Sequence, residues 1–103
     1  MLTCQDILRE LNRNARILKD SYSVSRIGLF GSFVHGQANS DSDIDIVVDL
    51  AEPSFDHYMD LKFFLEGLFG RSVDLVLADT VKPRLKPVIK REVVYAEGLQ
   101  AAG

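Results

Sequence analysis

The chain has 103 residues, of which 47% are hydrophobic and 26% are charged, a composition that is typical of globular proteins and excludes a disordered chain. This length leaves no room for a second catalytic or acceptor-binding domain, so we expect one domain over residues 1–103. The net charge of −3 excludes the broad basic field that drives nonspecific binding to nucleic acid, and no direct nucleic-acid binding is expected.

The first expected element is an amphipathic helix over residues 3–20. Thr3 and Asp6 form a start that resembles a capping box. Apolar residues then recur at steps of three and four positions, namely Cys4, Ile7, Leu8, Leu11, Ala15 and Leu18. Cys4 is the only cysteine, which excludes an intrachain disulfide, and we interpret it as a packing residue.

The expected location is cytoplasmic. The beginning of the chain lacks the apolar core of a secretion signal. The apolar runs are interrupted far short of the roughly 20 residues that a membrane-spanning helix needs. No membrane contact is therefore expected.

Two strands are expected next. A β-prone run over residues 24–30 is broken by Gly31-Ser32. A polar loop over residues 36–41 then leads to a second strand over residues 44–48, in which isoleucine and valine alternate with acidic residues. These two strands carry the residues of greatest chemical interest.

A second helix begins at Pro53-Ser54 and ends at Gly70, a residue type that commonly follows the last turn of a helix. Its expected buried stripe consists of Leu61, Phe64, Leu65 and Leu68. A third strand over residues 71–77 follows. This part of the chain thus alternates a helix with a strand.

The last expected helix spans residues 84–92, because Pro83 and Pro87 confine its start. Residues 93–95 either finish this helix or form a small edge strand. Five basic residues of the segment form either a solvated helix face or a phosphate-facing patch: Lys82, Arg84, Lys86, Lys90 and Arg91. The order of elements predicts an α+β fold, a small mixed sheet flanked by helices.

Three acidic residues indicate a metal site. Asp43 and Asp45 project from the same face of a strand with Cα atoms roughly 6.6 Å apart. If that face is partly buried, their charges repel by about 2.5 kcal/mol at an effective dielectric of about 20, whereas in bulk water the repulsion falls to about 0.6 kcal/mol. A hard divalent ion such as Mg²⁺ would relieve this repulsion. Asp74 lies within the third strand, and if that strand pairs beside the second, the three carboxylates converge, as two-metal phosphoryl transfer requires.

Gly31-Ser32 has the properties of a phosphate site. Glycine permits close approach of the backbone, serine supplies a hydroxyl, and a helical turn that begins at Ser32 would add free N–H groups. Residues 33–42 separate this pair from Asp43. This spacing places a candidate phosphate site and a candidate metal site close together in the sequence.

A calcium-binding loop is the competing interpretation. Asp41, Asp43, Asp45 and Glu52 match its positions 1, 3, 5 and 12. Ile46 stands where such a loop needs glycine, and no helical pattern precedes Asp41. We therefore reject this interpretation.

The segment GSFVHGQANSDSDIDIVV, residues 31–48, resembles the GS-x10-DxD signature of the DNA polymerase β-like nucleotidyltransferase superfamily. The short chain and the later sequence GRSVDLVLADTVKPRLKPVIKREVVY are similar to the minimal nucleotidyltransferase (MNT) group. The resemblance implies the nucleotidyltransferase fold. By position it makes Gly31 and Ser32 nucleotide-phosphate contacts and Asp43, Asp45 and Asp74 catalytic metal ligands.

The resemblance also implies a substrate, cofactors and a partner. Members of the MNT group are encoded beside HEPN-domain toxins, and the chemistry proposed for them is transfer of AMP from ATP to a toxin tyrosine. We therefore expect an Mg²⁺-dependent antitoxin with two ions, working in a hetero-oligomer or homo-oligomer. The alternatives are a non-catalytic antitoxin that acts by binding, and a small-molecule nucleotidyltransferase whose acceptor pocket forms in a homo-oligomer.

One position departs from the pattern of the group. Many members have Ala-Arg before the second glycine, whereas Val34-His35 precedes Gly36 here. A neutral His35 would supply less positive charge toward a triphosphate than arginine does. We therefore expect a lower nucleotide affinity or turnover.

Overall fold

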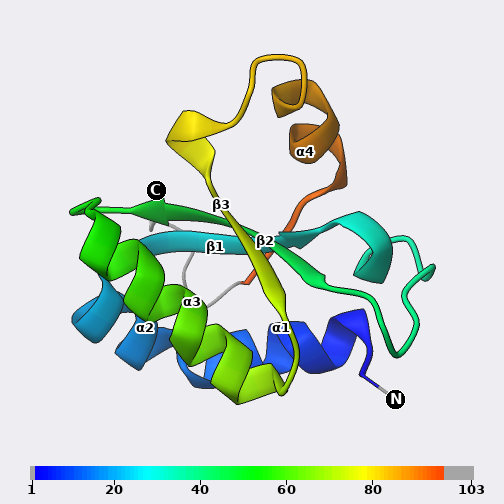
Figure 1. Cartoon of the computed structure of the whole chain (residues 1–103), viewed down its shortest axis with the longest axis horizontal. Coiled ribbons are helices and arrows are strands. Elements are labelled where there is room, and N and C mark those ends of the chain that lie inside the picture. The colour runs from blue at the N-terminus through cyan, green and yellow to red at the C-terminus, as the bar shows by residue number, and fades with distance from the viewer. Residues whose placement is uncertain (1, 97–103) are drawn as a thin grey trace.

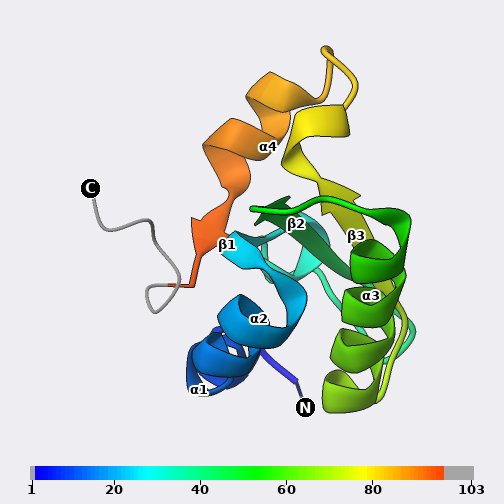
Figure 2. The ribbon, with the colours of Figure 1, turned by 90° about the vertical axis from the view of Figure 1, so that its left-hand side faces the viewer.

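The computed structural model describes residues 2–96 and contains a four-stranded mixed sheet with the order β3-β2-β1-β4. The strands are β1 (Val24–Phe30), β2 (Ile44–Leu50), β3 (Val73–Leu77) and β4 (Val94–Tyr95). β1 is antiparallel to both β2 and β4, whereas β2 is parallel to β3. Figure 1 shows the sheet, and in the turned view of Figure 2 β2 lies between β1 and β3. The expected α+β class is confirmed, and the open choice for residues 93–95 is resolved in favour of an edge strand.

The helices are divided between the two faces of the sheet. Figures 1 and 2 show α1 (Cys4–Arg13), α2 (Ala15–Tyr22) and α3 (Phe55–Phe69) together on one side, with α4 (Lys86–Glu92) on the other. The core lies between the sheet and the first three helices, and its fully buried members include Ile7, Leu11, Leu18, Ile27, Leu29, Ile44, Ile46, Leu61 and Leu65. The opposite face also carries apolar side chains, since Val47 alternates with the core residues Ile46 and Val48 and is 3% exposed.

The first helical segment differs from the prediction, because residues 3–20 form two helices rather than one. The chain turns at Asn14, where φ is −102° and ψ is 13°. The side-chain amide of Asn14 donates a hydrogen bond of 2.8 Å to the carbonyl oxygen of Glu10. An asparagine that hydrogen-bonds the backbone in this way competes with the helix, which explains the break.

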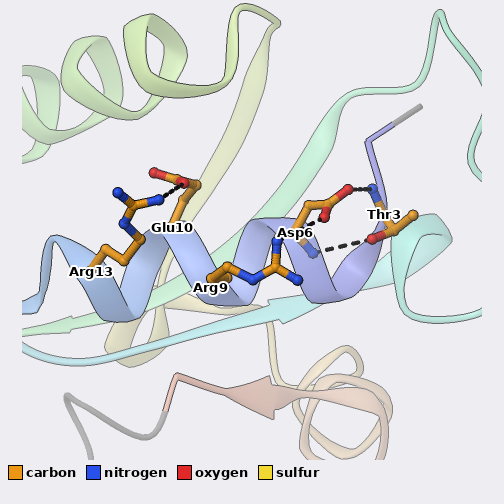
Figure 3. Close-up of polar contacts among 5 residues, drawn as sticks. All are labelled: Thr3, Asp6, Arg9, Glu10 and Arg13. Carbon is orange, nitrogen blue, oxygen red and sulfur yellow. Dashed lines mark hydrogen bonds and ion pairs between the residues drawn. The ribbon is translucent and has the colours of Figure 1, made fainter.

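The start of α1 is confirmed as a capping box. Figure 3 shows the Asp6 amide donating to Oγ1 of Thr3 and the Thr3 amide donating to Oδ2 of Asp6, at 3.1 and 3.0 Å. Arg9 and Arg13 form exposed ion pairs with Asp6 and Glu10 along the same helix. Such exposed pairs contribute little to stability, so the caps and the buried stripe define α1.

The later helices begin and end for local reasons. In α3, Oγ of Ser54 accepts a hydrogen bond from the His57 amide, and Gly70 ends the helix with φ of 66°. The last helix begins at Lys86 rather than at residue 84, since a turn occupies the residues before it and Pro87 lies in the first helical turn, where proline is tolerated. No helix within residues 2–96 is both long and apolar enough to cross a bilayer.

Candidate active site

Two of the three predicted acids are direct neighbours on the sheet. Asp45 of β2 pairs in register with Asp74 of β3. Adjacent Ile44 and Ile46 are completely buried in the core, so Asp45 points to the opposite face, where side chains in register on a parallel pair lie together. The condition for convergence, that the third strand pairs beside the second, is thus met for Asp45 and Asp74. Asp43 lies immediately before β2, where it is exposed.

The surroundings of Asp45 change the acid–base chemistry of its carboxyl group. Partial burial of Asp45, together with the negative charges of Asp74 and Asp43, raises the pKa of Asp45 to about 6. A hydrogen bond with Asp74 and the charge of Glu92 act in the same direction. A cation at this position would favour the ionised carboxylates, so the site has the electrostatics of a cation-binding site.

The Gly31-Ser32 pair forms a tight turn against these acids. Gly31–Phe33 is a 3₁₀ turn that directly follows β1. Gly31 has φ of +77°, and a Cβ atom placed on it would overlap Oδ2 of Asp45 and lie 3.0 Å from its Cγ. Only glycine satisfies both conditions without strain. The Gly31 amide donates to Glu92 rather than to the backbone, so it is a donor that a phosphate oxygen could accept from.

Arg71, a residue that was not identified from the sequence, anchors the loop between the Gly31 turn and Asp43. Nη1 of Arg71 donates hydrogen bonds of 3.1 Å to the carbonyl oxygens of Asn39 and Ser42. Its guanidinium lies 5.2 Å from the centre of the Phe33 ring. Arg71 therefore fixes the geometry of the spacer between Ser32 and Asp43.

Glu92, at the end of α4, is a second residue that was missed. Its Oε2 accepts a hydrogen bond of 3.4 Å from the Gly31 amide, and its Oε1 lies 3.2 Å from Nε2 of His35. Glu92 is the single acid in the strongly basic segment over residues 81–93, and this isolated charge was the available signal. His35 consequently faces a carboxylate of the chain itself.

A cavity of about 420 Å³ adjoins the acids beneath α4. Asp74, Gly31 and Glu92 lie on its wall, and apolar residues such as Phe30 and Val76 line the rest. Lys82 and Arg84 also line it, so two of the five basic residues face the cavity together with two acids. A second cavity, of about 470 Å³ beside α3, has no charged residue in its lining and offers no comparable chemistry.

The residues fit a cation that arrives together with phosphates. Within residues 2–96, no group of three or more histidine, cysteine, aspartate or glutamate side chains is arranged to hold a metal ion by itself, so the assignment of Asp43, Asp45 and Asp74 as ligands stays a prediction. Mg²⁺ commonly takes one or two protein carboxylates and completes its shell with water and substrate phosphates. The Asp45–Asp74 pair beside the glycine turn offers that donor set. A calcium-binding loop is ruled out, since β2 occupies its middle.

The fold, together with paired carboxylates that lie beside a glycine turn, defines the class of this protein. The family model described as "Nucleotidyltransferase domain" matches residues 11–96. The chain belongs to this nucleotidyltransferase family. The protein adenylyltransferase MntA of Thermococcus cleftensis is 42% identical over 96 residues, which cover 92% of this chain and 97% of that relative.

Solved structures agree with this assignment. A protein assigned as a minimal nucleotidyltransferase is 32% identical with a TM-score of 0.75, and the match covers 90% of this chain and 95% of that one. A crystal structure of a toxin-antitoxin with AMP-PNP is 25% identical with a TM-score of 0.70, over 86% and 74% of the two chains. A complex of a tri-AMPylated Shewanella oneidensis HEPN toxin with its MNT antitoxin, at 23% identity and a TM-score of 0.65 over 89% and 72%, shares the fold.

Proposed function

We propose that this chain is the antitoxin of a toxin–antitoxin pair and transfers AMP from ATP to a tyrosine of a HEPN toxin. The observation that carries the proposal is the register of Asp45 with Asp74 directly against the Gly31 turn. This arrangement brings a phosphate-binding backbone and two repelling carboxylates to one point. An Mg²⁺–triphosphate satisfies both groups at once.

Each predicted site residue has a role in this proposal. The Gly31-Ser32 turn binds the phosphates through its first amides and the serine hydroxyl. Asp43, Asp45 and Asp74 would hold the Mg²⁺ ions. Bound there, the cations would neutralise charge on the triphosphate and on the departing pyrophosphate. The cavity of about 420 Å³ beneath α4 would receive the nucleoside.

The reaction is an in-line displacement at the α-phosphorus. The tyrosine oxygen forms a bond to that phosphorus, the α–β phosphoanhydride bond breaks, and pyrophosphate leaves with the bonding electron pair. The phenolic proton passes to a carboxylate oxygen of Asp74, which lies on the exposed edge strand and is itself exposed. A base at the exposed edge suits an acceptor that is carried by another protein.

The proposed acceptor is supported by the similarity of this chain to known proteins. The relative with 42% identity is named a protein adenylyltransferase, which makes a protein side chain the acceptor class. The toxin-antitoxin structure with AMP-PNP supports both a nucleotide and a toxin partner. The cavity beside the acids has the size of a site for one small molecule, so a second chain must supply the acceptor.

The experiment is to incubate the protein with ATP, Mg²⁺ and the toxin encoded beside it, and to weigh the toxin by mass spectrometry. We expect the toxin to gain AMP groups on tyrosine, located by peptide mapping. An unmodified toxin would refute the proposal, provided that the same preparation of the protein binds ATP.

A non-catalytic antitoxin is the second candidate, favoured by one observation. Phe55 and Phe63 of α3 are 76% and 61% exposed, and large exposed apolar side chains are typical of protein contact surfaces. The double variant Asp43→Asn, Asp45→Asn distinguishes the two candidates. Loss of neutralisation supports catalysis, whereas full neutralisation by this variant supports inhibition by contact.

A further inference from the structure

Glu92 contacts the two groups of the site that are best suited to an anion. The Gly31 amide donates to its Oε2 at 3.4 Å, and Nε2 of His35 lies 3.2 Å from its Oε1. Both distances are at the long end for hydrogen bonds, whose usual N···O separation is about 2.9–3.0 Å. The carboxylate of Glu92 is thus held loosely by a backbone amide and an imidazole.

Glu92 adds to the negative charge around the site. It adds a fourth negative charge to a face that already carries Asp43, Asp45 and Asp74, and its charge acts on Asp45. Most of its side chain is removed from water, with 23% exposed, so the repulsion is only partly screened. A phosphate group of an Mg²⁺–ATP complex would bring its own cation to this place.

We propose that Glu92 occupies the position of a nucleotide phosphate in the free protein and is displaced when the triphosphate binds. The inference rests on the proposed function, because it takes ATP as the ligand. Glu92 would then lower the affinity for ATP, because ATP must displace the Glu92 carboxylate before the Gly31 amide becomes available. It also gives His35 a role, because its Nε2 is freed to face a phosphate oxygen.

The displacement requires little movement of the backbone. Glu92 is the last residue of α4, and Val94 two residues later already pairs with Leu29 of β1. This pairing fixes the backbone on one side, while the side chain has three rotatable bonds. A rotation of the Glu92 side chain therefore opens the site without unfolding α4.

The test is the affinity for ATP in the presence of Mg²⁺, measured by titration calorimetry for the unaltered protein and for Glu92→Gln. We expect Glu92→Gln to bind ATP about tenfold more tightly, because a neutral amide removes the like charge. The matched control is Asp79→Asn, which removes an equal charge from the exposed turn Ala78–Thr80. Its affinity should stay within about twofold of the original.

Three outcomes would overturn the inference. Weaker binding by Glu92→Gln would make Glu92 a ligand of the nucleotide or its cation. If Glu92→Gln binds ATP with the original affinity but is less stable, the role of Glu92 is to hold α4 in place. If even the unaltered protein fails to bind ATP, the nucleotide site itself is wrong and the role of Glu92 falls with it.

A second measurement does not depend on affinity. The backbone amide resonance of Gly31 in a ¹⁵N spectrum reports its hydrogen-bond partner. We expect this resonance to shift in Glu92→Ala without ligand and to shift again when ATP and Mg²⁺ are added. A Gly31 resonance that is unchanged by Glu92→Ala would show that the carboxylate does not occupy the site.

Discussion

Gly31 and Asp45 are packed so closely that a Cβ atom on Gly31 would overlap Oδ2 of the Asp45 carboxylate. Gly31 directly follows Phe30, the last residue of β1, and Phe30 pairs with Asp45 of β2. The spacer of ten residues over 33–42 is the length of chain that leaves β1, forms the turn and returns beside it. The spacing of the motif thus corresponds to a direct contact between the Gly31 turn and an acid.

Replacement of Gly31 by alanine should abolish ATP binding. The new Cβ would displace the Asp45 carboxylate, and a φ of +77° is unfavourable for alanine. We expect a loss in the free energy of unfolding of about 2 kcal/mol, read from urea denaturation. Calorimetry measures the accompanying loss of ATP binding.

The matched control is Gly36→Ala. Gly36 has a similar φ of +70°, but no atom lies within 4 Å of its added Cβ. This variant should lose about 1 kcal/mol of stability through backbone strain and should still bind ATP. Equal ATP affinities of the two variants would show that the overlap with Asp45 has no functional weight.

Replacement of Asp45 by asparagine should stabilise the metal-free protein at pH 7. Partial burial and the charges of Asp74 and Asp43 raise the pKa of Asp45 from 3.8 to about 6, so ionisation of Asp45 destabilises the fold. Because Asp45 is partly exposed, we expect a gain of about 1–2 kcal/mol rather than the full value of the shift. A destabilised variant would contradict the electrostatic account.

The same carboxylate gives the sign of a pH dependence. Its pKa is higher in the folded chain than in the unfolded chain, so the folded state retains this proton between about pH 4 and 6. The destabilisation by Asp45 is absent below this window and is fully present above pH 6. The difference in the free energy of unfolding between Asp45→Asn and the original protein should therefore increase as the pH rises from about 4 to about 6. Denaturation at several pH values measures this difference.

Arg71 should control the order of the loop that leads to Asp43. Arg71→Met removes the two hydrogen bonds to the carbonyl oxygens of Asn39 and Ser42, which should lower stability by about 1–2 kcal/mol. Arg71→Lys keeps the charge but lacks the planar fork, so it should restore only part of the loss. Hydrogen exchange at the amides of residues 37–43 measures the effect, and unchanged exchange in Arg71→Met would contradict it.

Mg²⁺ and ATP should stabilise the protein together far more than either does alone. The Asp45–Asp74 pair supplies too few ligands to hold the ion strongly, so phosphate oxygens must complete the shell. With both at about 100 times their joint dissociation constant, the gain is about 2.7 kcal/mol. A thermal-unfolding series with each component and with both tests this, and an equal shift with Mg²⁺ alone would indicate a preformed metal site.

The sequence predicted the parts of the site that lie on regular elements. Alternation along β2 placed Asp45 opposite the buried Ile44 and Ile46, and the structure confirms that face. The neighbouring position of Asp74 was conditional on strand pairing, because register depends on contacts between distant segments and not on local pattern.

The roles of residues that contact loops and helix ends could not be predicted from the sequence. The two hydrogen bonds of Arg71 join residues that are 29 and 32 positions apart in the chain, and the hydrogen bond between Gly31 and Glu92 joins residues 61 positions apart. A periodic pattern in the sequence does not indicate such contacts. The break at Asn14 was missed for a different reason. The apolar pattern continues through it, while a single side-chain hydrogen bond to Glu10 interrupts the helix.

The central claim is that the acids on β2 and β3 transfer AMP to the partner toxin, and Asp74→Asn tests it most directly. Asp74 lies in register with Asp45, is exposed, and has a matched control in Asp79→Asn on the following turn. Mass spectrometry of the toxin after incubation with ATP and Mg²⁺ measures the rate of AMP addition. We expect Asp79→Asn to modify the toxin at the original rate and Asp74→Asn to be slower by about 10²–10⁴-fold, the usual contribution of a general base. Equal rates for the two variants would contradict the account.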